Sequence, residues 1–381
     1  MKRYIQEQAF SDFHKKMLFI AGPRQCGKTT LVNNILSQQN ENGILTQYLN
    51  WDVELERARI LSREFPSKLE ILAFDEIHKY ARWRNLLKDL YDSKSGELKI
   101  IVTGSARLDY YRRGGDSLQG RYNLLRMHPL SLSEIYKERT NDAPNNILLE
   151  LFKLGNFPEP FLSGNKDEAK RWSNQYRIRL IREELADLEK ISEISLLEEL
   201  IFRLPECVGS PLSINSLRED LQLSHQTVSR WLKLLEVIYS IYRLLPFGSP
   251  RIKAVKKETK HYHWDWSIVE NEGARFENLT ASHLLKWCNW MEDTKGYFME
   301  LRFFRDREQR EVDFVILQDK KPIEFIECKL SKEKVSNSLK YLKNKYPKTS
   351  AVQISLEECE DVTTKEGIRI CDACTYLLEK I

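Results

Sequence analysis

Short apolar runs alternate with segments of helical periodicity across residues 1–143. The runs with the character of strands cover residues 17–21, 44–49, 69–74, 99–102 and 122–127. Strands that alternate with helices assemble into a parallel sheet covered by those helices. This region therefore predicts an α/β domain, in which a P-loop type of parallel sheet carries helices on both faces.

The pattern changes after residue 143. Across residues 144–210, apolar side chains such as Leu151 and Leu185 recur at spacings of three and four, which predicts an all-helical lid. Residues 211–265 hold two short helical patterns joined by a turn, then the strand-like run VIYSIYRLLPF, and this order outlines a winged helix. Residues 266–381 follow the order αβββαβ. We therefore predict four domains with these boundaries.

Composition and charge narrow the class of protein. The 381 residues are 41% hydrophobic and 10% aromatic, which is enough to fill several cores and excludes wholesale disorder. The 60 Lys and Arg residues against 56 Asp and Glu residues leave a net charge of +4, so affinity for nucleic acid must come from local basic patches. The most apolar stretch, residues 232–247, is interrupted by Lys233, Glu236 and Arg243, so no membrane span is expected.

The start of the chain and its cysteines agree on a compartment. The first sixteen residues, MKRYIQEQAFSDFHKK, contain no apolar segment of the kind that a secretory signal needs. The seven cysteines are odd in number and scattered, which favours reduced thiols over a disulfide framework. We therefore expect a cytoplasmic protein.

The strongest motif is G-x-x-x-x-G-K-[ST], which follows the first apolar run and opens a helix. In such a loop, backbone N–H groups surround the phosphates, the Lys28 amine reaches the β and γ oxygens, and the Thr29 hydroxyl binds Mg²⁺. The predicted nucleotide-binding residues of the loop are Gly22, Pro23, Arg24, Gln25, Cys26, Gly27, Lys28, Thr29 and Thr30.

Two further strand ends supply polar groups. The run ILAF enters Asp75 and Glu76 directly, so Asp75 is placed to hold Mg²⁺ and Glu76 to orient an attacking water. The next strand ends in Thr103-Gly104-Ser105, where Ser105 is a candidate for contact with the γ-phosphate. Turn-forming hydroxyls are an equal interpretation for this last group.

These three elements resemble the AAA-type ATPases. The segment SLQGRYNLLRMHPLSLSEIY, residues 117–136, resembles the segment that closes the ATPase core in one prokaryotic branch. The resemblance implies ATP as the nucleotide and makes Arg121 a candidate arginine finger, with Arg107 as a weaker alternative. Whether Arg121 acts in its own chain or across a subunit interface of a homo-oligomer stays open, as does a plain surface role.

The segment LREDLQLSHQTVSRWLKLLEV resembles a helix-turn-helix. Its second helix carries polar and basic side chains of the kind that contact bases and phosphates: His225, Gln226, Ser229, Arg230 and Lys233. A basic and partly aromatic flank follows, formed by Arg251, Lys253, Lys256, Lys257, Lys260, His261, Tyr262, His263 and Trp264. DNA binding is therefore predicted, and packing against protein is the alternative because many winged helices serve that purpose.

The C-terminal region holds a set of carboxylates and a lysine. Glu327 and Lys329 are two apart on one strand and share a face, Asp313 lies on the strand before, and Glu277 lies on the preceding helix. Glu277, Asp313 and Glu327 are the predicted ligands of Mg²⁺ or Mn²⁺, with Glu327 and Lys329 acting in catalysis. The set and its αβββαβ order resemble the PD-(D/E)xK nuclease superfamily, with Val312 in place of the usual proline. The alternative is that these charged residues form salt bridges left from an ancestral nuclease site and bind no metal.

The whole chain resembles bacterial and archaeal AAA-type ATPases joined to a winged helix and a nuclease-like domain. The leading hypothesis is an Mg²⁺-dependent ATPase that binds DNA and controls a nuclease domain. A second hypothesis is an ATP-driven switch whose winged helix and inert nuclease-like domain bind protein partners or branched DNA. A third is a signalling ATPase that recruits proteins and never contacts nucleic acid.

Overall fold

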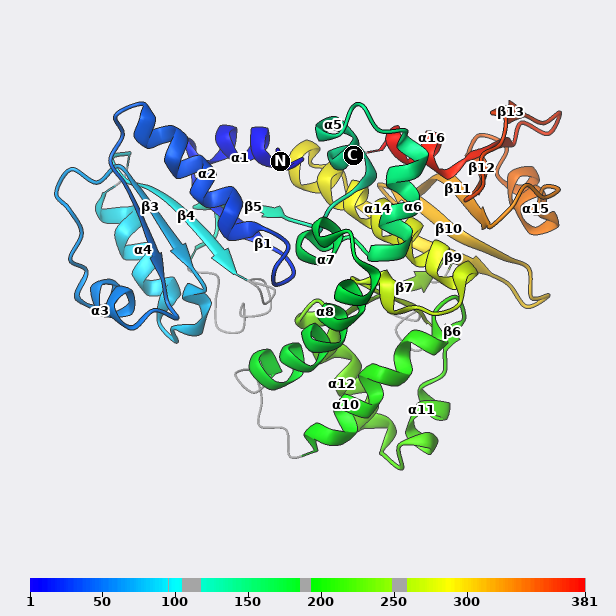
Figure 1. The fold of residues 1–381 in the computed structure, drawn as a ribbon, viewed down its shortest axis with the longest axis horizontal. Helices are drawn as coiled ribbons and strands as arrows, with labels where there is room; N and C mark the ends of the chain where they lie inside the picture. The colour runs from blue at the N-terminus through cyan, green and yellow to red at the C-terminus, as the bar shows by residue number, and fades with distance from the viewer. Residues whose placement is uncertain (95, 105–117, 186–192, 249–258, 381) are drawn as a thin grey trace. The chain divides into compact units, whose positions relative to one another are not determined.

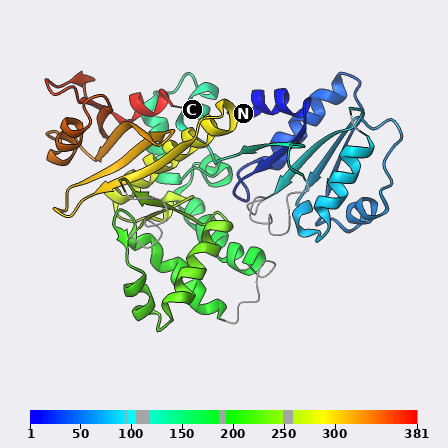
Figure 2. The ribbon, with the colours of Figure 1, turned by 180° about the vertical axis from the view of Figure 1, so that it is seen from behind.

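The computed structural model describes residues 1–94, 96–104, 118–185, 193–248 and 259–380. Contacts divide the chain into two compact units. The first unit contains residues 2–129 and 237–239, and the second contains residues 130–236 and 240–381 together with Met1. Figures 1 and 2 draw the ribbon from opposite sides. The four-domain division stays a prediction.

The first unit is built on a five-stranded sheet in the order β2-β3-β4-β1-β5, and every neighbouring pair is parallel. Its strands are β1 (Met17–Ala21), β2 (Thr46–Asn50), β3 (Ile71–Asp75), β4 (Lys99–Gly104) and β5 (Tyr122–Arg126). All five predicted strands are present. The predicted parallel α/β sheet is therefore confirmed.

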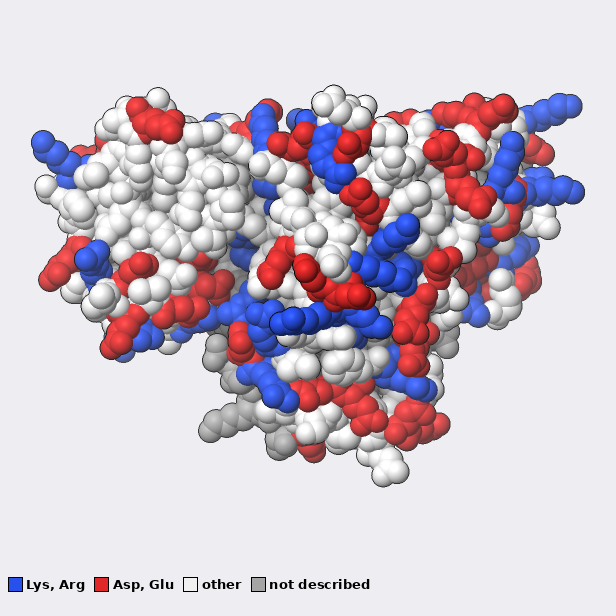
Figure 3. All heavy atoms as spheres, in the orientation of Figure 1, with Lys and Arg blue, Asp and Glu red and all other residues white. Residues whose placement is uncertain are grey.

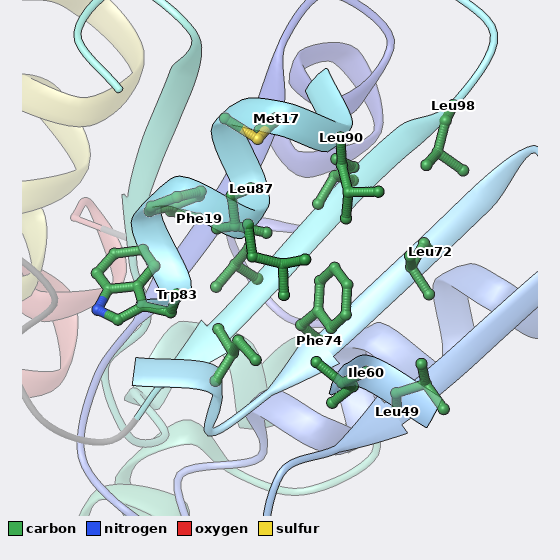
Figure 4. Close-up of a cluster of buried hydrophobic side chains, with 14 of the residues drawn as sticks. Met17, Phe19, Leu49, Ile60, Leu72, Phe74, Trp83, Leu87, Leu90 and Leu98 are labelled. Carbon is green, nitrogen blue, oxygen red and sulfur yellow. The ribbon is translucent and has the colours of Figure 1, made fainter. Parts of the chain in front are cut away.

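Helices cover both faces of this sheet, because its strands are apolar on both sides. Met17 and Phe19 of β1 belong to the core under α3 (Glu54–Ser62) and α4 (Trp83–Ser93), which Figure 4 shows. Leu18 and Ile20 belong to a second core, under α1 (Gln6–Phe13) and α2 (Lys28–Glu41). Alternate residues of one strand thus fill two cores, as the period of a strand requires.

The second unit begins with helices, as predicted for this region. They are α5 (Leu132–Glu138), α6 (Pro144–Leu154), α7 (Pro158–Ser163), α8 (Lys166–Arg179), the π-helix η3 (Leu180–Leu185), α10 (Ile194–Arg203) and the 3₁₀ turn η4 (Leu204–Cys207). Pro144 and Pro158 each stand in the first turn of a helix, where a missing N–H costs no hydrogen bond.

A small antiparallel sheet follows within the same unit. Its strands are β6 (Pro211–Leu212), β7 (Ile241–Pro246) and β8 (Thr259–His263), and the helices α11 (Ile214–Asp220) and α12 (His225–Val237) lie between β6 and β7 along the chain. β8 lies between the other two strands and pairs antiparallel with both of them. The two helices and β7 were predicted from the sequence, whereas the residues of β8 were assigned to a basic and partly aromatic flank.

The C-terminal elements continue this sheet. They are the turn η5 (Trp266–Ile268), α14 (Glu272–Lys295), β9 (Met299–Arg305), β10 (Glu311–Gln318), β11 (Lys321–Lys329), α15 (Asn337–Lys345), β12 (Ser350–Ser355), β13 (Val362–Thr363), β14 (Arg369–Asp372) and α16 (Ala373–Leu378). β7 pairs parallel with β9, so nine strands form one sheet in the order β13-β14-β12-β11-β10-β9-β7-β8-β6. The sequence did not predict this continuity, or the elements after β12.

None of the helices in the described ranges combines the length and the apolar character that crossing a membrane requires.

Candidate active site

The phosphate-binding loop lies between β1 and α2. Glycine is required at Gly22 by a close backbone contact and at Gly27 by a left-handed backbone conformation. A Cβ on Gly22 would lie 2.1 Å from the Met127 carbonyl oxygen on the neighbouring chain segment. Gly27 has a φ of +99° and Gln25 a φ of +59°, so the backbone turns through the left-handed region twice. These turns allow the backbone N–H groups at the start of α2 to face an anion.

Lys28 lies inside this loop and is only 5% exposed. Its Nζ donates to the carbonyl oxygens of Gly22 at 3.0 Å and Pro23 at 2.7 Å. Both acceptors are uncharged, so the positive charge of the ammonium is not neutralised by them. Among the other predicted loop residues, Pro23 and Cys26 are buried, Arg24 is half-buried, and Gln25, Thr29 and Thr30 are exposed.

Arg3 supports the loop and was missed by the sequence analysis. Its guanidinium donates to the Cys26 carbonyl oxygen at 2.5 Å and to the His128 carbonyl oxygen at 2.6 Å. The side chain is 7% exposed. Arg3 thus ties the loop to the segment after β5, but an arginine near the start of a chain gives no sequence signal for such a role.

Asp75 at the end of β3 collects three hydroxyl donors. Thr29 Oγ1 donates to its Oδ2 at 2.7 Å, Tyr48 OH donates to the same oxygen at 2.5 Å, and Thr103 Oγ1 donates to Oδ1. Burial by itself would raise the pKa of Asp75, but the three hydrogen bonds and the charge of Lys28 hold it below its usual value. The carboxylate is therefore ionised at neutral pH.

This arrangement fits the Mg²⁺ site that was predicted from Thr29 and Asp75. A hydroxyl and an ionised carboxylate lie within hydrogen-bonding distance of each other, beside a phosphate-binding loop. Mg²⁺ prefers such oxygen ligands and takes one or two from the protein, with phosphate oxygens and water as the others. Tyr48 and Thr103 orient the carboxylate, and neither was predicted to do so.

Glu76 follows in a left-handed conformation, with a φ of +55°. Its side chain is 12% exposed, and its Oε2 lies 3.6 Å from His78 Nε2 and 3.9 Å from Lys79 Nζ. Burial lowers the pKa of His78 although the charge of Glu76 opposes this, so the imidazole is neutral at pH 7. Glu76 is therefore a buried carboxylate beside a neutral histidine and a lysine, at the end of the strand that carries Asp75. Ser105 lies outside the described residues.

Arg121 lies just before β5, at the amino end of the parallel strands. In the register of β1 and β5, Met17 is opposite Tyr122 and Ala21 is opposite Arg126. Arg121 is therefore about five residues, or about 16 Å, from the level at which β1 enters the phosphate loop. Its guanidinium bonds the Asp92 carboxylate at 2.8 Å. Contact with a nucleotide held by the same chain is excluded by this distance, and Arg107 lies outside the described residues.

The predicted nuclease-like residues lie on three elements of the second unit. Glu277 is on α14, Asp313 is on β10, and Glu327 and Lys329 are on β11. Lys329 Nζ lies 3.0 Å from Glu327 Oε1, and the Cys328 N–H donates to Asp313 Oδ2 at 2.8 Å. Burial raises the pKa of Asp313, and the charges of Glu277 and Glu327 raise it further.

A fifth side chain, missed by the sequence analysis, lies among these groups. Lys260 Nζ is 2.8 Å from Glu277 Oε1, 2.5 Å from Glu311 Oε1 and 3.8 Å from Asp313 Oδ1. Within the described part of the chain, no three His, Cys, Asp or Glu side chains are grouped so that they could hold a metal ion. The ligand set predicted from Glu277, Asp313 and Glu327 is therefore not supported.

The second helix of the predicted winged helix, α12, has one buried face and one exposed face. Val228, Trp231, Leu232 and Leu235 are buried. The predicted contact residues divide as follows: His225, Gln226, Arg230 and Lys233 are exposed, and Ser229 is half-buried. Spacings of three and four place Gln226, Ser229, Arg230 and Lys233 on one side of the helix.

The prediction of a basic and aromatic flank available to DNA after this helix is wrong for the residues that the structure describes. Lys260, His261, Tyr262, His263 and Trp264 are at most 8% exposed. Four of them belong to β8, the middle strand of the small sheet, and burial lowers the pKa of His261 to about 4. Arg251, Lys253, Lys256 and Lys257 lie outside the described residues.

Comparison with protein families divides the chain into three parts. A family described as an AAA domain matches residues 14–136. Two families described as domains of unknown function, DUF8612 and DUF4143, match residues 145–274 and 272–375. An uncharacterized protein of Haemophilus influenzae is 22% identical over 78% of this chain and 78% of its own length. The uncharacterized protein Rv2008c of Mycobacterium tuberculosis is 20% identical over 85% of this chain and 73% of its own length.

Solved structures give weaker likenesses. AMPPCP-bound DnaA from Aquifex aeolicus is 15% identical, with a TM-score of 0.35 over 61% of this chain and 86% of that chain. The RuvB Holliday junction branch migration motor of Thermotoga maritima is 17% identical, with a TM-score of 0.32 over 60% and 82%. Scores this low do not establish a shared fold. The family match, the parallel sheet and the loop with Lys28 together identify residues 14–136 as a P-loop domain of the AAA type.

Proposed function

We propose that this protein is an Mg²⁺-dependent ATPase that binds duplex or branched DNA. The observation that carries the proposal is the phosphate loop with a buried Lys28, next to a Thr29 hydroxyl that bonds the ionised Asp75. A chance glycine-rich turn would not bring these three groups to the carboxyl end of the same parallel sheet.

Each group has one task in the proposed reaction. The loop N–H groups and Lys28 bind the β- and γ-phosphates, and Thr29 and Asp75 hold Mg²⁺, which neutralises charge on the phosphates. Glu76 orients the attacking water and accepts its proton. Glu76 Oε2 lies near His78 and Lys79, whereas Asp75 accepts from Thr29, Tyr48 and Thr103, which supports two separate tasks for two adjacent carboxylates.

Two variants test the ATPase. Lys28→Ala should abolish ATP hydrolysis because the γ-phosphate loses its cation, and Glu76→Gln should bind ATP but release product at a small fraction of the normal rate. Phosphate release and retention of labelled ATP measure the two effects. Lys68→Ala, at an exposed position of the same unit, is the matched control. Normal turnover in both Lys28→Ala and Glu76→Gln would exclude this site.

The position of Arg121 at the amino end of β5 leaves two roles for it, a surface ion pair with Asp92 or contact with the nucleotide of a second copy in a homo-oligomer. We propose that it acts as an arginine finger on the nucleotide of a neighbouring copy. Arg121→Ala should then lose turnover as Lys28→Ala does, and a mixture of the two variants should recover activity, since some interfaces combine an intact loop with an intact finger. Absence of recovery in the mixture would contradict action between copies.

DNA binding is proposed for α12. The order α10, β6, α11, α12, β7, β8, with β8 in the middle of the small sheet, supports a winged helix whose second helix is α12. On the face drawn in Figure 3, acidic and basic side chains alternate over α10 and α11, and Arg203 and Arg218 are ion-paired there. These two helices therefore present no uniformly basic surface, which leaves α12 as the better candidate.

Substitution of the exposed basic residues of α12 tests this proposal. Arg230→Ala and Lys233→Ala should each weaken binding to all duplexes and lower the salt dependence by about one released ion per lost phosphate contact. Fluorescence anisotropy with a labelled duplex at several salt concentrations measures both quantities. Arg218→Ala on α11 is the matched control. Equal affinity and equal salt slope in all three variants would favour a protein-binding role for this helix.

For the C-terminal region, the mixed sheet of β9 to β12 with α14 and α15 supports a nuclease-like topology. The hypothesis of metal-dependent cleavage needs a metal between Glu277, Asp313 and Glu327, but Lys260 lies among these groups. This observation favours the second hypothesis, an ATP-driven switch in which the nuclease-like domain is inert.

A further inference from the structure

The side chain of Lys260 comes from a different part of the chain than the acids that it contacts. It lies on β8, in the small antiparallel sheet, whereas Glu277 lies on α14 and Asp313 on β10. Its side chain is 0% exposed. A lysine is almost never fully buried unless it is paired, because removal of its charge from water is costly in free energy.

The contacts of its ammonium are those of a bound cation. Glu277 Oε1 lies at 2.8 Å and Glu311 Oε1 at 2.5 Å, with Asp313 Oδ1 at 3.8 Å. The Tyr262 hydroxyl donates to the same Glu277 oxygen at 2.6 Å, and the Phe303 ring centroid lies 5.8 Å from Nζ. An ammonium has three donors and no acceptor. The Glu277 and Glu311 oxygens lie within hydrogen-bonding distance of it, whereas Asp313 at 3.8 Å interacts with it through charge alone.

Two further cations pair with carboxylates of this cluster. Arg305 Nε lies 3.8 Å from Glu311 Oε2, and Lys329 Nζ lies 3.0 Å from Glu327 Oε1. Glu327 and Lys329, the other half of the predicted site, are therefore paired with each other. The carboxylates near Asp313 thus face cations that belong to the protein itself.

A dissolved metal ion can reach at least one of these acids from solvent. Glu277 also lines a cavity of about 820 Å³, together with Arg177, Phe202, Glu206, Glu270 and Asn271. An ion in this cavity could reach Glu277. To reach Asp313 and Glu277 together, it would have to displace the Lys260 ammonium from both carboxylates and leave it with Glu311.

We propose that the Lys260 ammonium occupies the cation position of this acid cluster in place of a divalent metal ion. The cluster then binds neither Mg²⁺ nor Mn²⁺, and the nuclease-like domain cleaves no phosphodiester bond. Lys260 instead joins β8 to α14 and β10, so the small sheet and the nuclease-like core form one body. The proposal does not depend on ATP hydrolysis or on DNA binding.

The direct test compares Mn²⁺ binding by the full-length wild type and by Asp313→Asn, without nucleotide. Free Mn²⁺ measured by electron paramagnetic resonance gives the number of ions bound. We expect the same number for both proteins, and no cleavage of linear, single-stranded or branched DNA by either in Mg²⁺ or Mn²⁺. One additional ion bound by the wild type, or cleavage that Asp313→Asn abolishes, would overturn the proposal.

A second variant tests the position of the ammonium itself. Lys260→Ala removes the cation and leaves Glu277, Glu311 and Asp313 around the vacated space, so it should bind one Mn²⁺ more than the wild type. The double variant Lys260→Ala with Asp313→Asn should lose that ion again. A folded Lys260→Ala that gains no ion would contradict the assignment. If Lys260→Ala does not fold, the comparison of wild type with Asp313→Asn still tests whether the acid cluster binds a metal ion, since both proteins retain the lysine.

Discussion

Two aspartates, Asp75 at the end of β3 and Asp313 in β10, have opposite kinds of neighbours. Asp75 is surrounded by the hydroxyl groups of Thr29, Tyr48 and Thr103. Asp313 lies near the ammonium of Lys260, among the other carboxylates that this lysine contacts. Hydroxyl groups orient a carboxylate without cancelling its charge, so Asp75 retains an attraction for Mg²⁺ and Asp313 does not.

The pKa directions follow the same division. Hydrogen bonds hold the pKa of Asp75 below its usual value although burial opposes them. Burial and the neighbouring charges of Glu277 and Glu327 raise the pKa of Asp313, against the charge of Lys260. The two carboxylates are therefore ionised to different extents at the same pH. The contrast also extends to two of the buried lysines, Lys28 and Lys260.

The largest expected effect separates these lysines. Lys260→Met leaves buried carboxylates without their cation and should lower the free energy of unfolding by about 3–5 kcal/mol, the usual cost of removing one partner of a buried ion pair. Lys28→Met removes hydrogen bonds to two neutral carbonyl oxygens and the weaker attraction of its charge for Asp75, so it should abolish ATP turnover with at most about 1–2 kcal/mol of lost stability. Chemical denaturation and ATPase assays on both variants measure the contrast. Equal losses of stability would show that the two lysines play the same structural part.

The next effect separates the aspartates. Asp75→Asn should reduce ATP turnover by on the order of 10²-fold, because the Mg²⁺ ligand loses its charge while its shape is kept. Asp313→Asn should leave turnover unchanged, and its stability should be equal to or above that of the wild type because an ionisable buried group has been removed. The ratio of the two turnover rates at saturating ATP measures the effect. A loss of turnover in Asp313→Asn would mean that the acid cluster takes part in ATP hydrolysis.

The smallest effect is the pH dependence of stability. Because the pKa of Asp75 is lowered by folding, its contribution is present above its unfolded value near 4 and is lost as the pH falls through the folded value. The pKa of Asp313 is raised, so its contribution is present below about 4 and is lost as the pH rises. Relative to wild type, Asp75→Asn should therefore lose stability with rising pH and Asp313→Asn should gain it.

Differences from the wild type are the correct quantity for this measurement. Burial lowers the pKa of His261 and His283 to about 4, so these histidines destabilise the wild type and every variant as the pH falls from about 6.5. Subtraction removes this shared contribution. Parallel pH profiles for Asp75→Asn and Asp313→Asn would contradict the opposite pKa directions.

Periodicity predicted much of the fold, because local apolar patterns determine strands and helices that are buried on known faces. The five strands of the parallel sheet, the helices of 144–210 and the αβββαβ order all follow from such patterns. Lys28, Thr29 and Asp75 were predicted because their motif has fixed spacing and a fixed context. The Mg²⁺ ligands therefore required no tertiary information beyond the order of strands.

The remaining features depend on residues that are distant in the sequence, and no spacing connects them. Arg3 reaches the phosphate loop from the start of the chain, and the register of β1 and β5 decides that Arg121 is too far from its own nucleotide. Lys260 was predicted to lie in a basic and partly aromatic flank because its neighbours in sequence are basic and aromatic. Only the pairing of β7 with β9, which joins two sheets into one, brings this lysine to the acids of α14 and β10. Sequence alone thus determined which groups could bind a cation, and tertiary structure decided which cation each cluster faces, because charge is neutralised through space.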